Sequence, residues 1–344
     1  MQTDLLTDDE MGATFSAHHV PGASITVMDG NRVAWTRAWG VRSLTTHEPV
    51  DTDTRFPTCS MTKTVNGLLF MMLSRDGVVD LDAAANFYLK GWRLQGPDAD
   101  RVTIAMLLTH TGGTSVFGYW GYTPGVPIPT LEQVLDGTSP ANCLPVRMVR
   151  PPGVEISYSS GGTTVLQKLV EDVTGKSYAA VVQERILEPL GMRNSAIQMR
   201  PAPDATNIAL GHRDGVMVRG GYCVQPELAS TGLWSTGSDY ARFLAAIIDA
   251  FHGRPEAVIP RELAVRMVTP PFGDAALGCF SQRPGIFNHA GGGVGYRTHY
   301  VADANTGRAV ITLSNGEEGA APLKQLRQTI CDRLGWVLPG DPPA

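Results

Sequence analysis

The chain has 344 residues, of which 43% are hydrophobic and 18% are charged. This is ordinary globular composition with enough length for a large core, and about 150 residues per domain predicts two lobes or one discontinuous fold. The formal net charge is −5 at pH 7. Without a surplus of basic residues the chain is poorly suited to bind a phosphate backbone, so we expect no nucleic-acid partner.

The cysteines and the start of the chain bear on its compartment. The five cysteines are scattered and form no C-x-x-C pair, which favours reduced thiols over a disulfide framework. The first residues lack the basic and apolar regions of a signal peptide, and no apolar run approaches the roughly 18 residues of a membrane span. The histidines show no metal-ligand spacing. We therefore expect a cytoplasmic protein with no membrane partner, no metal and no other cofactor.

Near the N-terminus the sequence predicts a helix followed by a hairpin. Residues 7–10 (TDDE) fit a capping box, so the helix runs from there to about residue 18. Residues 23–28 and 32–39 are strand-like, and the Asp-Gly-Asn segment between them is a strong hairpin signal.

The stretch at residues 60–74 is apolar almost all round and lacks strand alternation, which predicts a buried helix. Later helices are expected at residues 103–109, 163–173, 177–190, 238–251 (with Ser238 as N-cap) and 322–334. Later strands are expected at residues 276–280, 286–290, 296–302 and 309–314.

Strands therefore lie at both ends of the chain and helices lie in the middle. The simplest topology is an α+β fold in which both chain ends build one antiparallel sheet flanked by helices. We expect residues 1–78 and 220–344 to form this α/β domain, and residues 79–219 to form an inserted, mainly helical domain.

Ser60 and Lys63 are three residues apart on the predicted buried helix, so their side chains share one face. A lysine amine can activate a serine hydroxyl when its surroundings disfavour the ammonium form. S-x-x-K alone also fits a helical serine beside a solvated lysine, but this helix is too apolar to present a lysine freely to water. Cys59 is a rival nucleophile that points about 100° away and has no lysine three residues on.

Six blocks follow one another along the chain: FPTCSMTKT (56–64), GVVDLDAAANFYL (77–89), LLTHTGG (107–113), PPGVEISYSS (151–160), STGLWSTGSDYARFL (230–244) and HAGGGVGY (289–296). In these blocks the chain resembles the serine β-lactamase-like superfamily, which includes class C β-lactamases, D-peptidases and family VIII esterases. The resemblance covers nearly the whole chain, and the blocks agree in order and spacing.

The resemblance implies further site residues. Tyr158-Ser159-Ser160 stands where the family has Tyr-x-Asn, so Tyr158 would share proton transfer with Lys63. Ser160 replaces the asparagine and would contact substrate with a shorter reach. A plain structural alternative for Tyr158 is a loop tyrosine that packs before the next helix.

His289-Ala290-Gly291 matches the family's Lys-Thr-Gly strand, and the following Gly292 N–H would join the Ser60 N–H as an oxyanion hole. The alternative is a sheet bulge that binds no substrate. His110-Thr111-Gly112 has the same pattern after a helix, and we interpret His110 as a structural histidine.

Substrate preference depends on charge at this strand. His289 is a weaker anchor for a carboxylate than the family's lysine, unless Arg297 lies nearby and compensates. We therefore favour an uncharged ester or amide over penicillins. In the aromatic loop at residues 117–122, Tyr119 and Trp120 either line an apolar substrate wall or pin the loop to the surface.

The predicted function is a serine hydrolase that acts through an acyl-enzyme on a small-molecule ester or amide, with weak or no β-lactamase activity. No G-x-S-x-G elbow, H-E-x-x-H motif or P-loop offers another chemistry. The alternatives are an acyltransferase to a small-molecule acceptor and a D-aminopeptidase-type peptidase. A non-catalytic scaffold is disfavoured because Ser60, Lys63 and Tyr158 are all present.

Overall fold

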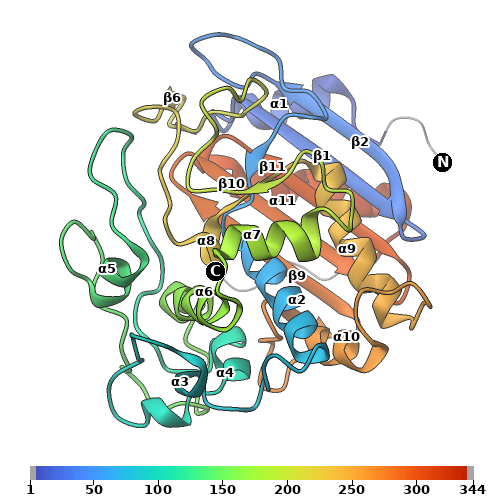
Figure 1. Ribbon diagram of the computed structural model, residues 1–344. Helices are drawn as coiled ribbons and strands as arrows, with labels where there is room; N and C mark the ends of the chain where they lie inside the picture. The colour runs from blue at the N-terminus through green and yellow to red at the C-terminus, as the bar shows by residue number, and fades with distance from the viewer. Residues whose placement is uncertain (1–4, 339–344) are drawn as a thin grey trace.

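Both ends of the chain build one six-stranded antiparallel sheet (Figure 1). The computed structural model describes residues 5–338. The strand order is β2-β1-β11-β10-β9-β8, so the first strand of the chain pairs with the last. The strands are β1 (Gly22–Asp29), β2 (Arg32–Gly40), β8 (Phe280–Arg283), β9 (Ile286–Gly293), β10 (Tyr296–Asp303) and β11 (Arg308–Ser314). This arrangement confirms the predicted fold class.

Helices cover both faces of this sheet. Alternation along β10 shows the two layers, because Tyr300 packs in the cluster that contains α2 and α9, whereas Val301 packs in the cluster that contains α1 and α11. The α-helices are α1 (Asp8–Ser16), α2 (Thr62–Arg75), α3 (Ala85–Tyr88), α4 (Ile104–Leu108), α5 (Leu131–Asp136), α6 (Ser160–Thr174), α7 (Tyr178–Val182), α8 (Leu228–Thr231), α9 (Gly237–Phe251), α10 (Arg261–Val268) and α11 (Ala320–Leu334).

Short elements complete the fold. A small sheet in the order β3-β7-β4 joins the nucleophile segment to the rest of the chain, and a separate hairpin pairs β5 with β6. These strands are β3 (Phe56–Pro57), β4 (Ala196–Ile197), β5 (His212–Arg213), β6 (Val216–Met217) and β7 (Leu233–Ser235). The single-turn helices are η1 (Cys59–Met61), η2 (Ala99–Arg101), η3 (Gln183–Leu187, a π-turn) and η4 (Glu317–Gly319).

Residues 79–219 carry α3 to α7, and Figure 1 shows α3 to α6 grouped to one side of the sheet, with α7 between them and α9. Their apolar side chains belong to the same hydrophobic cluster as α2 and α9. Strand β4 of this segment also pairs with β7. The two parts therefore share a continuous core, and the division at residues 78/79 and 219/220 stays a prediction.

Two local predictions were wrong. The N-cap of α9 is Thr236, whose hydroxyl accepts a hydrogen bond from the Asp239 N–H, and Ser238 lies inside the helix. Residues 276–279 do not form a strand, because this apolar segment packs on α2 instead of pairing. There the Thr64 hydroxyl donates to the Gly278 carbonyl, and the strand begins only at Phe280. The predicted capping box at Thr7 and Glu10 is confirmed.

Within the described residues the cysteines all carry free thiols. Across residues 5–338, no helix has both the length and the apolar character needed to span a lipid bilayer.

Candidate active site

Ser60 and Lys63 lie one turn apart at the junction of η1 and α2. Lys63 is buried, with 2% of its surface exposed, and Ser60 is half-buried. The Lys63 Nζ lies 3.2 Å from the Ser60 Oγ. Because residues three apart nearly eclipse one another in a 3₁₀ turn, this geometry aims the amine directly at the hydroxyl. The structure thus brings together the pair that the sequence predicted.

A third residue, which the sequence reasoning missed, completes the surroundings of the lysine. Ser230 on α8 is fully buried, and its hydroxyl lies 2.8 Å from the Lys63 Nζ. The Ser230 carbonyl is 3.3 Å from the same nitrogen. A buried lysine needs such partners, because an unpaired ammonium would be costly to remove from water. The block at residues 230–244 begins with this serine, but the sequence alone assigned it no role, because it lies 167 residues from Lys63 along the chain.

Tyr158 lies beside the same amine. The Lys63 Nζ is 5.0 Å from the centre of the Tyr158 ring. This ring packs at a tilt against the rings of His110, with centroids 4.3 Å apart, and Phe117, with centroids 5.1 Å apart. Among the described residues, the Tyr158 hydroxyl has no hydrogen-bond partner, so it makes no hydrogen bond to Ser60 Oγ. Aromatic contacts therefore position the ring and leave its hydroxyl uncommitted.

The backbone around Tyr158 is fixed by the start of α6. Ser159 is the N-cap, and its hydroxyl accepts a hydrogen bond from the Gly162 N–H. The Ser159 N–H donates to His110 Nδ1 at 3.2 Å. Burial, followed by electrostatic interactions with Lys63 and His289, lowers the pKa of His110 well below its usual value. His110 is thus a neutral, hydrogen-bonded structural residue, as the sequence predicted.

Strand β9 passes close beneath the nucleophile turn. A side chain at Gly291 would place its Cβ 2.5 Å from the Thr58 carbonyl oxygen, so only glycine fits there. Strand β8 pairs with β9 only at Ile286 and Asn288. Residues 289–293 therefore have no strand partner on that edge, which leaves backbone groups available near Ser60.

His289 is buried on this strand, and its Nδ1 lies 2.6 Å from the Ala290 carbonyl oxygen, to which it donates. Burial and then the charge of Lys63 lower the pKa of His289 to about 3, against the effect of the Ala290 hydrogen bond. The imidazole is therefore neutral at physiological pH. It cannot supply the positive charge that a lysine would bring to this position.

The sequence left the place of Arg297 open, and the structure puts it on strand β10, from where its charge still acts on Cys59. Arg297 is paired with Gly292 across β10 and β9, so the two residues share one face of the sheet. Gly291 faces the nucleophile turn, and alternation along the strand turns Gly292 and Arg297 to the opposite face. The guanidinium thus lies behind the strand.

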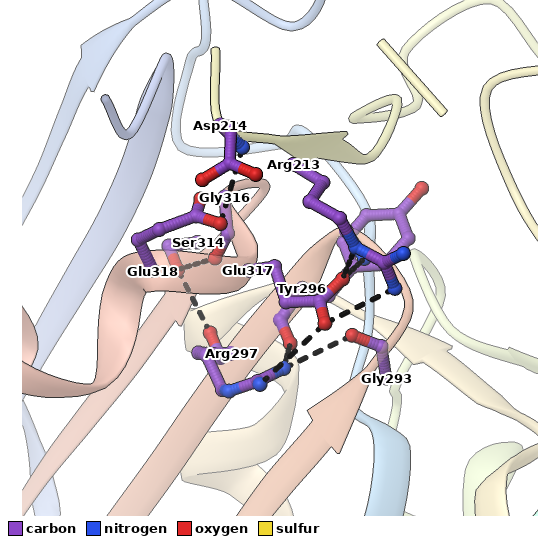
Figure 2. A network of polar contacts seen from close by, with 10 residues as sticks. Arg213, Asp214, Gly293, Tyr296, Arg297, Ser314, Gly316, Glu317 and Glu318 are labelled. Atoms are coloured by element: carbon purple, nitrogen blue, oxygen red, sulfur yellow. Dashed lines mark hydrogen bonds and ion pairs between the residues drawn. The ribbon is translucent and has the colours of Figure 1, made fainter. Parts of the chain in front are cut away.

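In that position Arg297 braces the turn between β9 and β10 (Figure 2). Its Nη1 donates to the carbonyls of Gly293 at 3.0 Å and Tyr296 at 2.8 Å. Glu317 accepts the Gly295 N–H at 3.0 Å and also pairs with Arg213 at 2.8 Å. Burial raises the pKa of Glu317, but the hydrogen bonds from Arg213 and Gly295 outweigh it and hold the pKa below its usual value.

A small pocket opens beside Gly292 and Gly293. Its walls are mainly aromatic and apolar, and its polar side chains include Gln225 and Thr231. The pocket is lined by Pro57, Cys59, Tyr119, Cys223, Gln225, Thr231, Trp234, Gly292, Gly293, Val294 and Tyr296. Tyr119 lines this pocket, so the predicted apolar wall for a substrate would be here.

Two other predicted substrate contacts are less well placed. Trp120 is 74% exposed and does not line this pocket. Ser160 is buried at the first turn of α6, and its side chain makes no hydrogen bond to Ser60 or Lys63. The roles of both residues stay predictions.

The rival nucleophile and a buried acid lie close by. Burial raises the pKa of the Cys59 thiol to about 12, against the effects of Arg297 and Lys63, so this thiol is not activated. Glu227, at the start of α8, is fully buried, and burial raises its pKa to about 8.

No group of three or more His, Cys, Asp or Glu side chains in residues 5–338 is arranged to hold a metal ion.

Several known proteins are similar to this chain in sequence. The chain is 32% identical over 189 residues to penicillin-binding protein 4 of Amycolatopsis lactamdurans, covering 54% of this chain and 47% of that protein. It is 24% identical to a D-aminopeptidase of Gluconobacter oxydans, over 86% of this chain and 56% of the relative. The chain thus spans about half the length of these two curated relatives.

The solved structures agree on the fold. The octameric penicillin-binding protein homologue from Pyrococcus abyssi superposes with a TM-score of 0.78 at 24% identity, covering 96% of this chain and 77% of that one. The sequence itself matches the Beta-lactamase family over residues 7–332. Since that match spans nearly the whole chain, the protein belongs to the Beta-lactamase family.

Proposed function

We propose that the protein is a serine hydrolase that forms an acyl-enzyme on Ser60 with an uncharged carboxylic ester or amide. The observation that carries this proposal is the 3.2 Å contact between Lys63 Nζ and Ser60 Oγ in a buried setting. A neutral amine at this distance can take the hydroxyl proton as the oxygen attacks the substrate carbonyl.

The remaining steps follow from groups around the pair. The backbone N–H groups of Ser60 and Gly292 would bind the developing oxyanion, an effect typically worth about 3–4 kcal/mol for one donor. Collapse of the tetrahedral intermediate breaks the bond to the leaving alcohol or amine, which receives the proton through Lys63 or Tyr158. Water then attacks the acyl-Ser60 ester, releases the acid and restores the serine.

The preference for uncharged substrates rests on the charges around Ser60. Lys63 is the basic side chain in contact with Ser60, and its nitrogen is occupied by its own hydrogen bonds. His289 is neutral, and Arg297 lies on the opposite face of the sheet. At this strand a substrate carboxylate would meet only Arg297 across the strand, and that guanidinium already donates to the Gly293 and Tyr296 carbonyls. The mainly apolar pocket beside Gly292 suits a neutral acyl or alcohol group instead.

A D-aminopeptidase-type activity is the second candidate, because the relatives include a D-aminopeptidase. It would use the same acyl-enzyme with a D-amino-acid amide. Acyl transfer is distinguished from hydrolysis by adding a small alcohol or amine and looking for a product that forms only in its presence.

The experiment compares two esters that differ in charge. Purified protein is given p-nitrophenyl butyrate and the mono-p-nitrophenyl ester of succinic acid, with Ser60→Ala as the blank. We expect p-nitrophenol release from the neutral ester, with kcat/KM at least about tenfold higher than for the anionic one. Release no faster than from Ser60→Ala would overturn the hydrolase proposal, and equal rates for both esters would overturn the charge preference.

A further inference from the structure

We propose that Ser230 is a positioning residue that holds the Lys63 amine so that its lone pair faces Ser60. This inference rests on the proposed function, in which Lys63 is the base. Three oxygen atoms surround the Lys63 Nζ: Ser60 Oγ at 3.2 Å, Ser230 O at 3.3 Å and Ser230 Oγ at 2.8 Å. Ser230 thus supplies two of the three, from its backbone and its side chain.

The ammonium and neutral forms of Lys63 differ in the number of N–H donors that they offer to these oxygens. An ammonium group has three N–H donors, one for each of the three oxygens. A neutral amine keeps two N–H donors and gains a lone pair. If both donors stay on the Ser230 carbonyl and hydroxyl, the lone pair points to Ser60 Oγ, where a base must act. Ser230 would therefore orient the neutral amine as well as stabilise the ammonium form.

The position of Ser230 is fixed independently of the lysine. Its N–H donates to the Glu227 carbonyl at 3.0 Å, and the neighbouring Ala229 N–H donates to Gln167 Oε1 on α6 at 3.1 Å. Among the described residues, Lys63 is the only hydrogen-bond partner of the Ser230 hydroxyl. A fully buried hydroxyl with this one partner acts on the lysine and on little else.

Ser230→Ala removes the hydroxyl and keeps the carbonyl. The amine then loses one of its two fixed contacts, and the ammonium form loses a charge-assisted hydrogen bond. We expect kcat/KM per active site to fall about tenfold. We also expect the acidic limb of the kcat/KM profile to move by about 0.5–1 pH unit to lower pH, because the neutral amine becomes easier to form.

The test measures kcat/KM for p-nitrophenyl butyrate from pH 5 to 9, with active sites counted by covalent fluorophosphonate labelling. Ser24→Ala is the matched control, since Ser24 is also a buried serine but lies on β1. Ser230→Thr keeps the hydroxyl, so its acidic limb should stay at the wild-type pH even if the added methyl slows the rate.

Different results would overturn the role of Ser230 and the proposed hydrolase function. An acidic limb that does not move in Ser230→Ala, or one that moves equally in Ser24→Ala or Ser230→Thr, would overturn the role of the Ser230 hydroxyl. A wild-type protein that neither turns over ester nor accepts label would overturn the proposed hydrolase function instead.

Discussion

The Lys63 amine lies over the ring of Tyr158, 5.0 Å from its centre, while the same nitrogen contacts the Ser60 hydroxyl at 3.2 Å. The ring therefore stands next to the proposed base without a hydrogen bond to it. Catalytic hydrogen bonds are often loose before substrate binds and tighten in the complex. Because the Tyr158 hydroxyl is not committed to another group of the described residues, it is available to exchange a proton with the leaving group.

Tyr158→Phe is predicted to lower kcat about 100-fold, because it removes the hydroxyl but keeps the ring that packs on His110 and Phe117. The melting temperature should stay within a few degrees of wild type. Tyr88→Phe is the matched control, since its hydroxyl accepts a hydrogen bond from the Asp80 N–H far from the site. Steady-state kinetics check this, and an unchanged kcat in Tyr158→Phe would exclude the phenol from proton transfer.

Glu317→Ala is predicted to lower kcat about tenfold with little change in KM. The substitution removes the acceptor for the Gly295 N–H and for Arg213, so the turn that follows Gly292 loses its brace. Glu318→Ala is the control, because Glu318 lies in the same η4 turn but accepts its hydrogen bond from the Asp214 N–H and not from Gly295 or Arg213. If both variants lose activity to the same extent, the brace does not act through the oxyanion strand.

His289 should make stability depend on pH. Its pKa is about 3 in the folded protein and has a reference value of 6.5, so the unfolded chain binds a proton in this range while the folded one does not. Stability attributable to His289 is therefore present above pH 6.5 and is lost as the pH falls toward 3. Between pH 7 and pH 5 this amounts to about 2 kcal/mol.

The measurement is urea unfolding of the wild type and His289→Gln at pH 7 and pH 5. The variant should lose about 2 kcal/mol less unfolding free energy between the two pH values than the wild type does. Identical losses would show that His289 titrates normally in the fold, which its burial argues against.

Much of the site could be predicted because its first members are close in sequence. Helical periodicity alone places Ser60 and Lys63 on one face, and the blocks around Tyr158 and His289 resemble those of a known superfamily. The predicted strands near both termini likewise led to the antiparallel sheet, since strands that flank a helical segment pair most simply with each other.

The remainder depends on tertiary structure. Ser230 opens the block at residues 230–244, but its contact with Lys63 spans 167 residues of sequence and follows only from the tertiary structure. The side on which Arg297 lies depends on the register of β9 and β10, where a shift of one residue would reverse every side chain. The segment at residues 276–279 has the composition of a strand, but contacts with α2 decide its conformation.

The central claim is that Ser60, and not Cys59, carries an acyl group in the course of the reaction. Intact-mass analysis of the protein mixed with p-nitrophenyl butyrate and quenched in acid tests it directly. We predict a butyryl adduct on the wild type and on Cys59→Ala, located at Ser60 by peptide mapping, and none on Ser60→Ala. An adduct that persists in Ser60→Ala, or that maps to Cys59, would contradict the account.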